Sequence, residues 1–112
     1  MERMMVRPYS DRFLLGLQHA DPEHTGVQLA QLCIKAKVPN AHVANVLGIT
    51  RKTVHDWFRG GKIRQKTKPK LERLYKLIEQ GLADGKLPTP NYTATKVFME
   101  SEVKPMLVVA HE

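Results

Sequence analysis

Charged and hydrogen-bonding side chains recur at helical spacing between residues 51 and 59. If this stretch is a helix with Val54 and Trp57 facing inward, its other positions form one outer surface rich in hydrogen-bond donors. A surface of this width fits the major groove of double-stranded DNA, where such groups can bind base edges. The residues expected to contact bases are Arg51, Lys52, His55 and Asp56.

Each of these side chains also has an interpretation that requires no base contact. We expect Arg51 to donate to a guanine, although it could be merely solvated, and Lys52 could reach a phosphate instead. His55 could bind a base edge or a phosphate, or stack near Trp57. Trp57 itself is expected in the core rather than as a platform for base stacking.

Asp56 is the one acidic residue on this surface. Because a carboxylate repels phosphates, it should either accept a hydrogen bond from a cytosine amino group or pair with Arg59 within the helix. We favour the pair with Arg59.

A basic segment follows the predicted helix. Residues 51–76 hold ten Lys/Arg against Asp56 and Glu72, a net charge of +8, whereas the rest of the chain sums to about −1. A basic block of this kind suits a polyanion, either nucleic acid or an acidic membrane surface. Its cations follow no apolar pattern, so we expect them to contact phosphates, which position a protein on DNA without reading sequence. The expected phosphate-contacting residues are Asn40, Thr50, Thr53, Arg59, Lys62, Arg64, Lys66 and Lys68.

Helical periodicity and helix-end signals predict an all-α fold, a compact bundle of about five helices with an uncertain C-terminal tail. The expected helices are a short one capped by Ser10, then 25–37, 40–47, one capped by Thr50 that runs to about residue 59, and a longer one from Pro69 to about residue 84. After Pro90 the pattern fits either a helix and a tail or two short strands.

The two central helices have the pattern of a helix-turn-helix. Ala44 must be small because the second helix crosses close to it, and Gly48 permits the tight turn. The positions expected to face the shared core are Val43, Leu47, Ile49, Val54 and Trp57.

This stretch resembles the Cro/C1-type helix-turn-helix regulators of phages and bacteria. The matching residues are Val43-Ala44, Leu47-Gly48-Ile49-Thr50-Arg51, Thr53-Val54, Trp57, Arg59-Gly60 and Lys68-Pro69-Lys70-Leu71, and the resemblance covers roughly residues 25–84. It implies a bundle of four or five helices that generally binds operator DNA as a dimer, with the outer residues of the second helix meeting bases. The chain departs from the family where Pro39-Asn40 replaces the preferred Ser or Thr. It departs again in a longer, more basic connector, which suggests an extra backbone clamp.

Several classes of protein are disfavoured. Cys33 is the only cysteine, so no disulfide framework is expected and the thiol should pack as a small apolar group. No two histidines stand at i, i+4 spacing, so no metal is expected, and nothing suggests a cofactor. The acidic residues are dispersed without a paired motif, which argues against an enzyme. No run of 18 apolar residues occurs, so we expect no membrane span and a cytoplasmic location.

The sequence therefore predicts a helix-turn-helix DNA-binding domain at residues 1–90 and a C-terminal extension at residues 91–112. The expected function is sequence-specific regulation of transcription by a homodimer bound to double-stranded DNA. Apolar residues of the extension are the candidate dimer interface, namely Val97, Phe98, Leu107 and Val108. The alternative is an accessory factor for phage DNA packaging or recombination that uses the same motif. A ring or cooperative filament would favour that alternative, and a discrete dimer the regulator.

Overall fold

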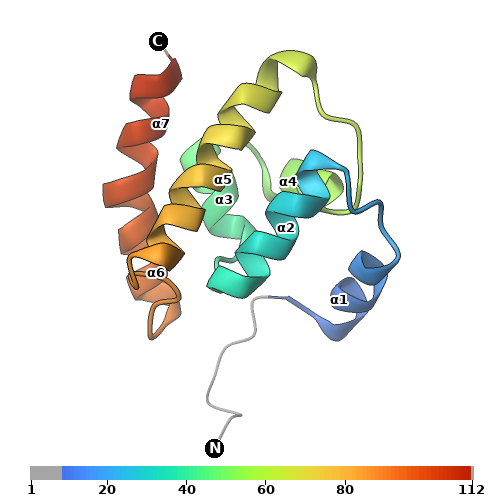
Figure 1. Cartoon of the computed structure of the whole chain (residues 1–112), viewed down its shortest axis with the longest axis horizontal. Helices are drawn as coiled ribbons and strands as arrows, with labels where there is room; N and C mark the ends of the chain where they lie inside the picture. The colour runs from blue at the N-terminus through green and yellow to red at the C-terminus, as the bar shows by residue number, and fades with distance from the viewer. Residues whose placement is uncertain (1–8, 112) are drawn as a thin grey trace, which may run out of the picture.

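The computed structural model describes the backbone of residues 9–111 and the side chains of residues 9–107. Every regular element of this described part is helical, which confirms the predicted all-α fold (Figure 1). The helices are α1 (Asp11–Gln18), α2 (Thr25–Ala36), α3 (Asn40–Leu47), α4 (Arg51–Phe58), α5 (Lys68–Ala83), α6 (Tyr92–Phe98) and α7 (Lys104–His111). A 3₁₀ turn (Gln65–Thr67) leads into α5, and a π-helical stretch (Met99–Val103) joins α6 to α7.

Local hydrogen bonds explain where several helices begin and end. The side chains of Ser10, Thr50 and Asn91 each accept a hydrogen bond from the N–H three residues later, at 3.1, 3.2 and 2.8 Å. The first two caps were predicted. Helices α2 and α3 end in left-handed residues, Lys37 with φ of 57° and Gly48 with φ of 71°.

Helix α2 is the central element and packs against both α5 and α4 (Figure 1). Its apolar residues Leu29, Leu32, Cys33 and Ala36 are buried, and Cys33 among them has no exposed surface. Burial raises the pKa of the Cys33 thiol, which keeps it neutral in the apolar core, as expected. At the start of α2, a Cβ on Gly26 would lie 2.3 Å from the carbonyl oxygen of Trp57. The close approach of α2 to the end of α4 therefore requires a glycine.

Residues 92–111 form one continuous helical segment, so the alternative of two strands is wrong. Met99, Val103 and Leu107 recur every four residues on one face of this segment and are all buried. The segment packs against α5 and α3. Residues 92–107 thus contribute to the same core as the helices before them.

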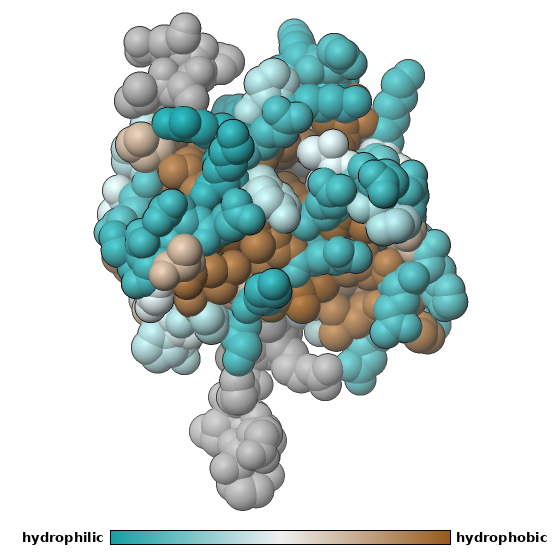
Figure 2. Space-filling model, in the orientation of Figure 1, coloured by the Kyte–Doolittle hydropathy of each residue, from teal (hydrophilic) through white to brown (hydrophobic). Residues whose placement is uncertain are grey.

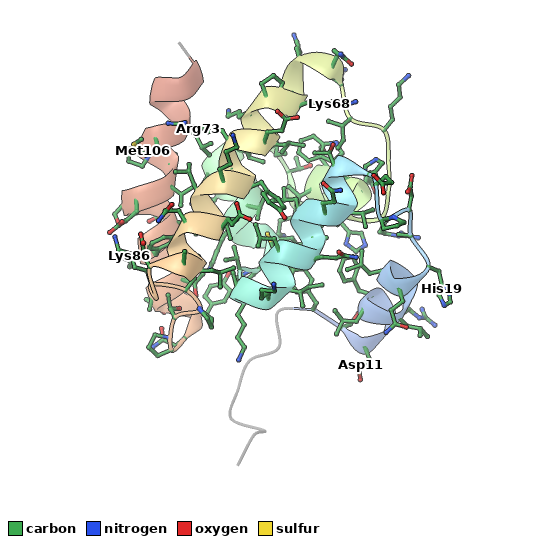
Figure 3. The ribbon with its side chains drawn as sticks, viewed as in Figure 1. Asp11, His19, Lys68, Arg73, Lys86 and Met106 are labelled. Carbon is green, nitrogen blue, oxygen red and sulfur yellow. The ribbon has the colours of Figure 1, made fainter. Side chains whose placement is uncertain are left out.

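Two residues predicted for the dimer interface lie inside the protein. Leu107 is buried and Phe98 is partly buried against the core, because both face α5 and α3 rather than solvent. Val97 is 56% exposed, and the side chain of Val108 lies outside the described part. Met106 is also exposed, and Figure 3 shows it on the side of α7 that faces away from α5.

Polar contacts fasten this C-terminal segment to α3. The buried His42 ring lies 4.4 Å from the Tyr92 ring, centroid to centroid, and its Nε2 is 3.3 Å from the Tyr92 carbonyl oxygen. Asn45 donates to Glu100 at 2.9 Å. Burial lowers the pKa of His42, which favours the neutral ring in this contact.

On the face shown in Figure 2, hydrophobic residues form a band across the middle of the molecule and extend toward α1, between polar groups above and below. Leu15 of α1 is the most exposed large apolar side chain of the described part, at 60%. Tyr9, just before α1, ties the start of this helix to the core because its hydroxyl donates to the Val38 carbonyl at 2.7 Å.

Candidate nucleic-acid interface

Helices α3 and α4 form the two arms of a helix-turn-helix, and α4 also rests on α2. The turn is closed by a hydrogen bond of 3.0 Å from the Ile49 N–H to the Ala44 carbonyl. Ala44 is buried, as predicted, and Ile49 is half-buried. The other predicted core positions are buried as well: Val43, Leu47, Val54 and Trp57.

Phe58 is a core residue that the sequence analysis missed. It has no exposed surface and lies 6.2 Å from the Tyr9 ring and 6.4 Å from the Phe13 ring, centroid to centroid. Its position four residues after Val54 could have identified it. With Val54, Trp57 and Phe58 inward, the register of α4 is fixed.

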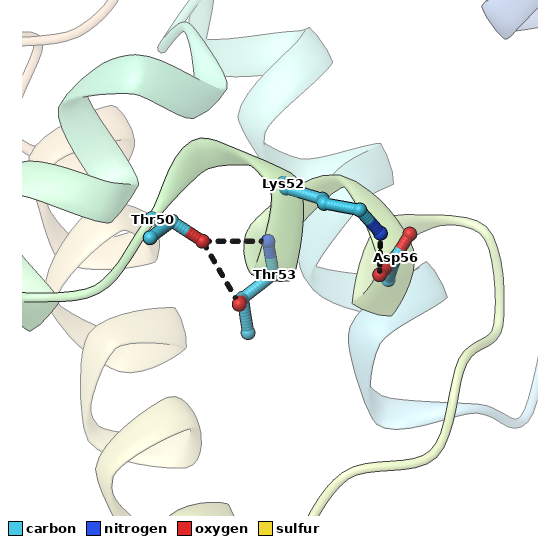
Figure 4. A network of polar contacts seen from close by, with 4 residues as sticks. All are labelled: Thr50, Lys52, Thr53 and Asp56. Atoms are coloured by element: carbon cyan, nitrogen blue, oxygen red, sulfur yellow. Dashed lines mark hydrogen bonds and ion pairs between the residues drawn. The ribbon is translucent and has the colours of Figure 1, made fainter.

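The outer face of α4 presents Arg51, Lys52, Asp56 and Arg59, all exposed. Asp56 pairs with Lys52 at 3.3 Å, one helical turn earlier (Figure 4). The predicted intrahelical pair with Arg59 is not the one that forms, because the i, i+4 spacing brings the Lys52 ammonium over the carboxylate. The Arg51 and Arg59 side chains consequently stay available to a ligand.

His55 lies on the flank of α4 rather than at the centre of its outer face. It is half-buried, and its ring is 5.4 Å from the Phe13 ring of α1, centroid to centroid. The ring contact of His55 is therefore a tilted one with Phe13, and not stacking near Trp57. A base contact by His55 would have to come from the exposed edge of the ring.

The expected phosphate contacts begin at the ends of α3 and α4. Asn40 is the half-buried first residue of α3, and Pro39 before it provides no side-chain cap. Unpaired N–H groups in a first helical turn attract anions. At the start of α4, the Thr50 and Thr53 hydroxyls are 3.0 Å apart and bonded to each other (Figure 4). Thr50 caps the helix, so only part of its hydrogen-bonding capacity is left for DNA.

The connector after α4 leaves the helix through a double-glycine turn. Gly60 has φ of 96°, and the Gly61 N–H donates to the Asp56 carbonyl at 2.7 Å. A Cβ on Gly61 would lie 2.6 Å from that same oxygen, so the turn requires glycine. His24, a residue that the sequence analysis passed over, bonds the Gly61 carbonyl through Nε2 at 2.8 Å and accepts from the Gly26 N–H through Nδ1 at 3.0 Å. It joins the start of α2 to the end of α4.

The remainder of the connector holds its cations in solvent. Lys62, Arg64 and Lys66 are exposed, and Lys68 is half-buried at the start of α5, where Figure 3 shows it near the top of the molecule. Ile63 is buried, so this charged segment also contributes one side chain to the core. The buried Ile63 side chain fixes the path of the chain between the exposed Lys62 and Arg64.

The predicted site residues thus lie at the start of α3, on the outer face and flank of α4, and in the connector that follows it. Among the described residues, His, Cys, Asp and Glu do not gather into a group of three or more that could hold a metal ion. None of the described helices combines the length and hydropathy that a membrane span requires. The chain matches no family model, and comparison with curated proteins and with solved structures gives no match either.

Proposed function

We propose that this protein binds double-stranded DNA and regulates transcription by reading the major groove with α4. One observation carries the proposal. The buried face of α4 orients its opposite, exposed face, which bears Arg51 and Lys52, with Arg59 at the end of the helix and the basic connector directly after it. This arrangement gives a narrow, donor-rich helix for base edges and, in the connector, a set of cations for phosphates.

The charge distribution supports the same function. Residues 51–76 carry a net charge of +8 on a chain with a total of +7. Neutralising phosphates releases counterions, so these cations would supply affinity for any duplex, and α4 would supply discrimination. The proposed function is DNA binding, which needs no catalytic group or cofactor. A protein with this function would be located in the cytoplasm, with the DNA.

We further propose a homodimer, because one reading helix spans only a few base pairs and two half-sites add specificity. Leu107 is excluded from its interface by its burial, and Phe98 offers only part of its ring because the rest packs against the core. The exposed apolar residues of the C-terminal segment, Val97 and Met106, are left as candidates, with Leu15 of α1 as the alternative.

Selection of bound sequences from a pool of random duplexes tests the proposal directly. A regulator should enrich a short motif, with a two-fold repeat about 10 base pairs from centre to centre if it binds as a dimer. The mass of the free and DNA-bound protein should be measured on the same sample. Binding of duplexes without enrichment of a motif would show that α4 does not read the base sequence. Enrichment by a ring or filament would favour the packaging or recombination factor.

A further inference from the structure

A cleft of about 570 Å³ lies between α1 and the C-terminal half of α4. The half-buried Phe13 of α1 forms the accessible part of its apolar floor, above the buried Leu17 of α1 and Phe58 of α4. Volumes of a few hundred Å³ with an apolar floor are typical of small-molecule sites.

Gly16 leaves one wall of the cleft open. A Cβ added to this residue would meet no atom within 4 Å, although the residue lies in the middle of a helix. A larger side chain there would improve helix propensity and occupy space above the floor. The open wall therefore gives access to the Phe13 ring, and a larger side chain at position 16 offers a way to close the cleft.

The rim of the cleft is basic on both sides. Arg12 and His19 come from α1, and His55 and Arg59 come from α4. Figure 3 shows His19 near the end of α1, at the edge of the molecule. None of the described residues that line the cleft is an aspartate or a glutamate. Basic groups from two helices thus face a common space without a carboxylate to balance them, which makes the space attractive to an anion.

We propose that this cleft binds a small organic anion with a flat apolar body, of the arylcarboxylate class. The body lies on the half-buried ring of Phe13, and the carboxylate accepts hydrogen bonds from the guanidinium groups of Arg12 and Arg59. The choice of ligand depends on both the ring and the cations. A DNA phosphodiester would satisfy the cations but leave the Phe13 ring uncovered, and a neutral apolar molecule would leave the cations unpaired.

Ligand binding in the cleft would also affect DNA binding, because Arg59 belongs both to the rim and to the exposed face of α4. An anion that engages Arg59 removes it from a phosphate, so the ligand and DNA should weaken each other's binding reciprocally. This coupling rests on the proposed function, whereas binding of the anion by itself does not.

The experiment is a calorimetric titration of the full chain, without DNA, with naphthoate and with naphthylmethanol. These probes share one aromatic body and differ in charge. Naphthoate is expected to bind at one site per chain, about ten-fold more tightly than the alcohol, because only the acid forms charge-assisted hydrogen bonds. Gly16→Phe should weaken both probes about ten-fold by filling the cleft, while Gly16→Ala should leave both within about two-fold of the parent.

Charge is tested separately from shape. Arg12→Gln should weaken naphthoate about five-fold and leave naphthylmethanol unchanged, and Lys35→Gln, an exposed change on α2 outside the cleft, should alter neither. If Gly16→Phe melts at a lower temperature than the parent, the comparison of Arg12→Gln with Lys35→Gln still tests whether the cleft binds the anion.

Three results would overturn the proposal: no binding of either probe at millimolar concentration, equal affinities for acid and alcohol, or unchanged naphthoate binding in both Gly16→Phe and Arg12→Gln. If naphthoate fails to bind but Arg12→Gln weakens duplex binding, the rim is a DNA-backbone contact. Because the probe titrations contain no DNA, loss of the proposed function would leave their outcome intact.

Discussion

Helix α4 and the connector after it carry the same sign of charge but hold it in different ways. The cations of α4 project from a backbone whose register is fixed by Val54, Trp57 and Phe58 in the core. The connector is held at Gly61, through His24 and the Asp56 carbonyl, and at the buried Ile63, and the cations Lys62, Arg64 and Lys66 next to these points are exposed. Base edges must be met with directional hydrogen bonds, whereas phosphates accept a charge in many geometries. The comparison shows that charge marks a surface for a polyanion, while backbone rigidity decides which charges can discriminate.

The largest expected effect is on stability, and it comes from truncating a side chain on the buried face of α4. Phe58→Ala should lower the free energy of unfolding by about 3–5 kcal/mol, because Phe58 is fully buried and its truncation leaves a cavity beside Tyr9 and Phe13. Urea denaturation followed by circular dichroism measures this. Lys52→Ala on the opposite face is the control and should stay within about 0.5 kcal/mol of the parent. If the two variants were equally stable, the helix would be rotated from its described register.

The next largest effect is also on stability, and it comes from a substitution where α3 and α4 cross. Ala44→Leu should cost about 1–3 kcal/mol of stability by overpacking a buried contact, and DNA affinity should fall with the melting temperature. Ala83→Leu, at an exposed position near the end of α5, is the matched change and should be nearly neutral. A variant at position 44 that melts like the parent yet fails to bind DNA would place Ala44 on the DNA side.

Arg51 tests the reading face itself. Arg51→Ala should cost about 1–3 kcal/mol at one base pair of a selected site and relax the preference there, with little change in binding to random duplex. Titrations against the selected site and its single-base variants provide the measurement. Lys104→Ala, which removes one charge from the exposed surface of α7, serves as the electrostatic control. An equal loss of affinity for every sequence would show that Arg51 contacts a phosphate instead of a base.

The smallest expected effect is on DNA affinity, and it comes from substituting single lysines of the connector. Lys62→Ala or Lys66→Ala should weaken binding to all sequences alike and reduce the slope of log affinity against log salt by about 1. The same titrations, repeated at several salt concentrations, measure it. A change of base preference in either variant would mean that the connector, and not α4, reads the sequence. If neither these variants nor Arg51→Ala affects binding, the region is not a DNA interface.

Local signals in the sequence determined most of the helix-turn-helix. Ser10 and Thr50 cap their helices because a hydroxyl before a first turn can accept an N–H locally, and Gly48 ends α3 because it adopts the left-handed conformation. The inward positions of α4 follow from its periodicity alone, and this includes Phe58, four residues after Val54, although only Val54 and Trp57 were predicted. These features depend on residues within four positions of one another, so they can be read without the fold.

Only the tertiary structure decided the rest, because those contacts join residues far apart in the chain. The apolar residues after Pro90 suited either strands or a helix until α5 and α3 provided a surface that buries Met99 and Leu107. His24 has no local signal for its bond to the Gly61 carbonyl, 37 residues away. The cleft between α1 and α4 likewise exists only where two separate helices meet. Periodicity assigns a face to a helix, but the element that covers this face is chosen by the packing of the whole chain.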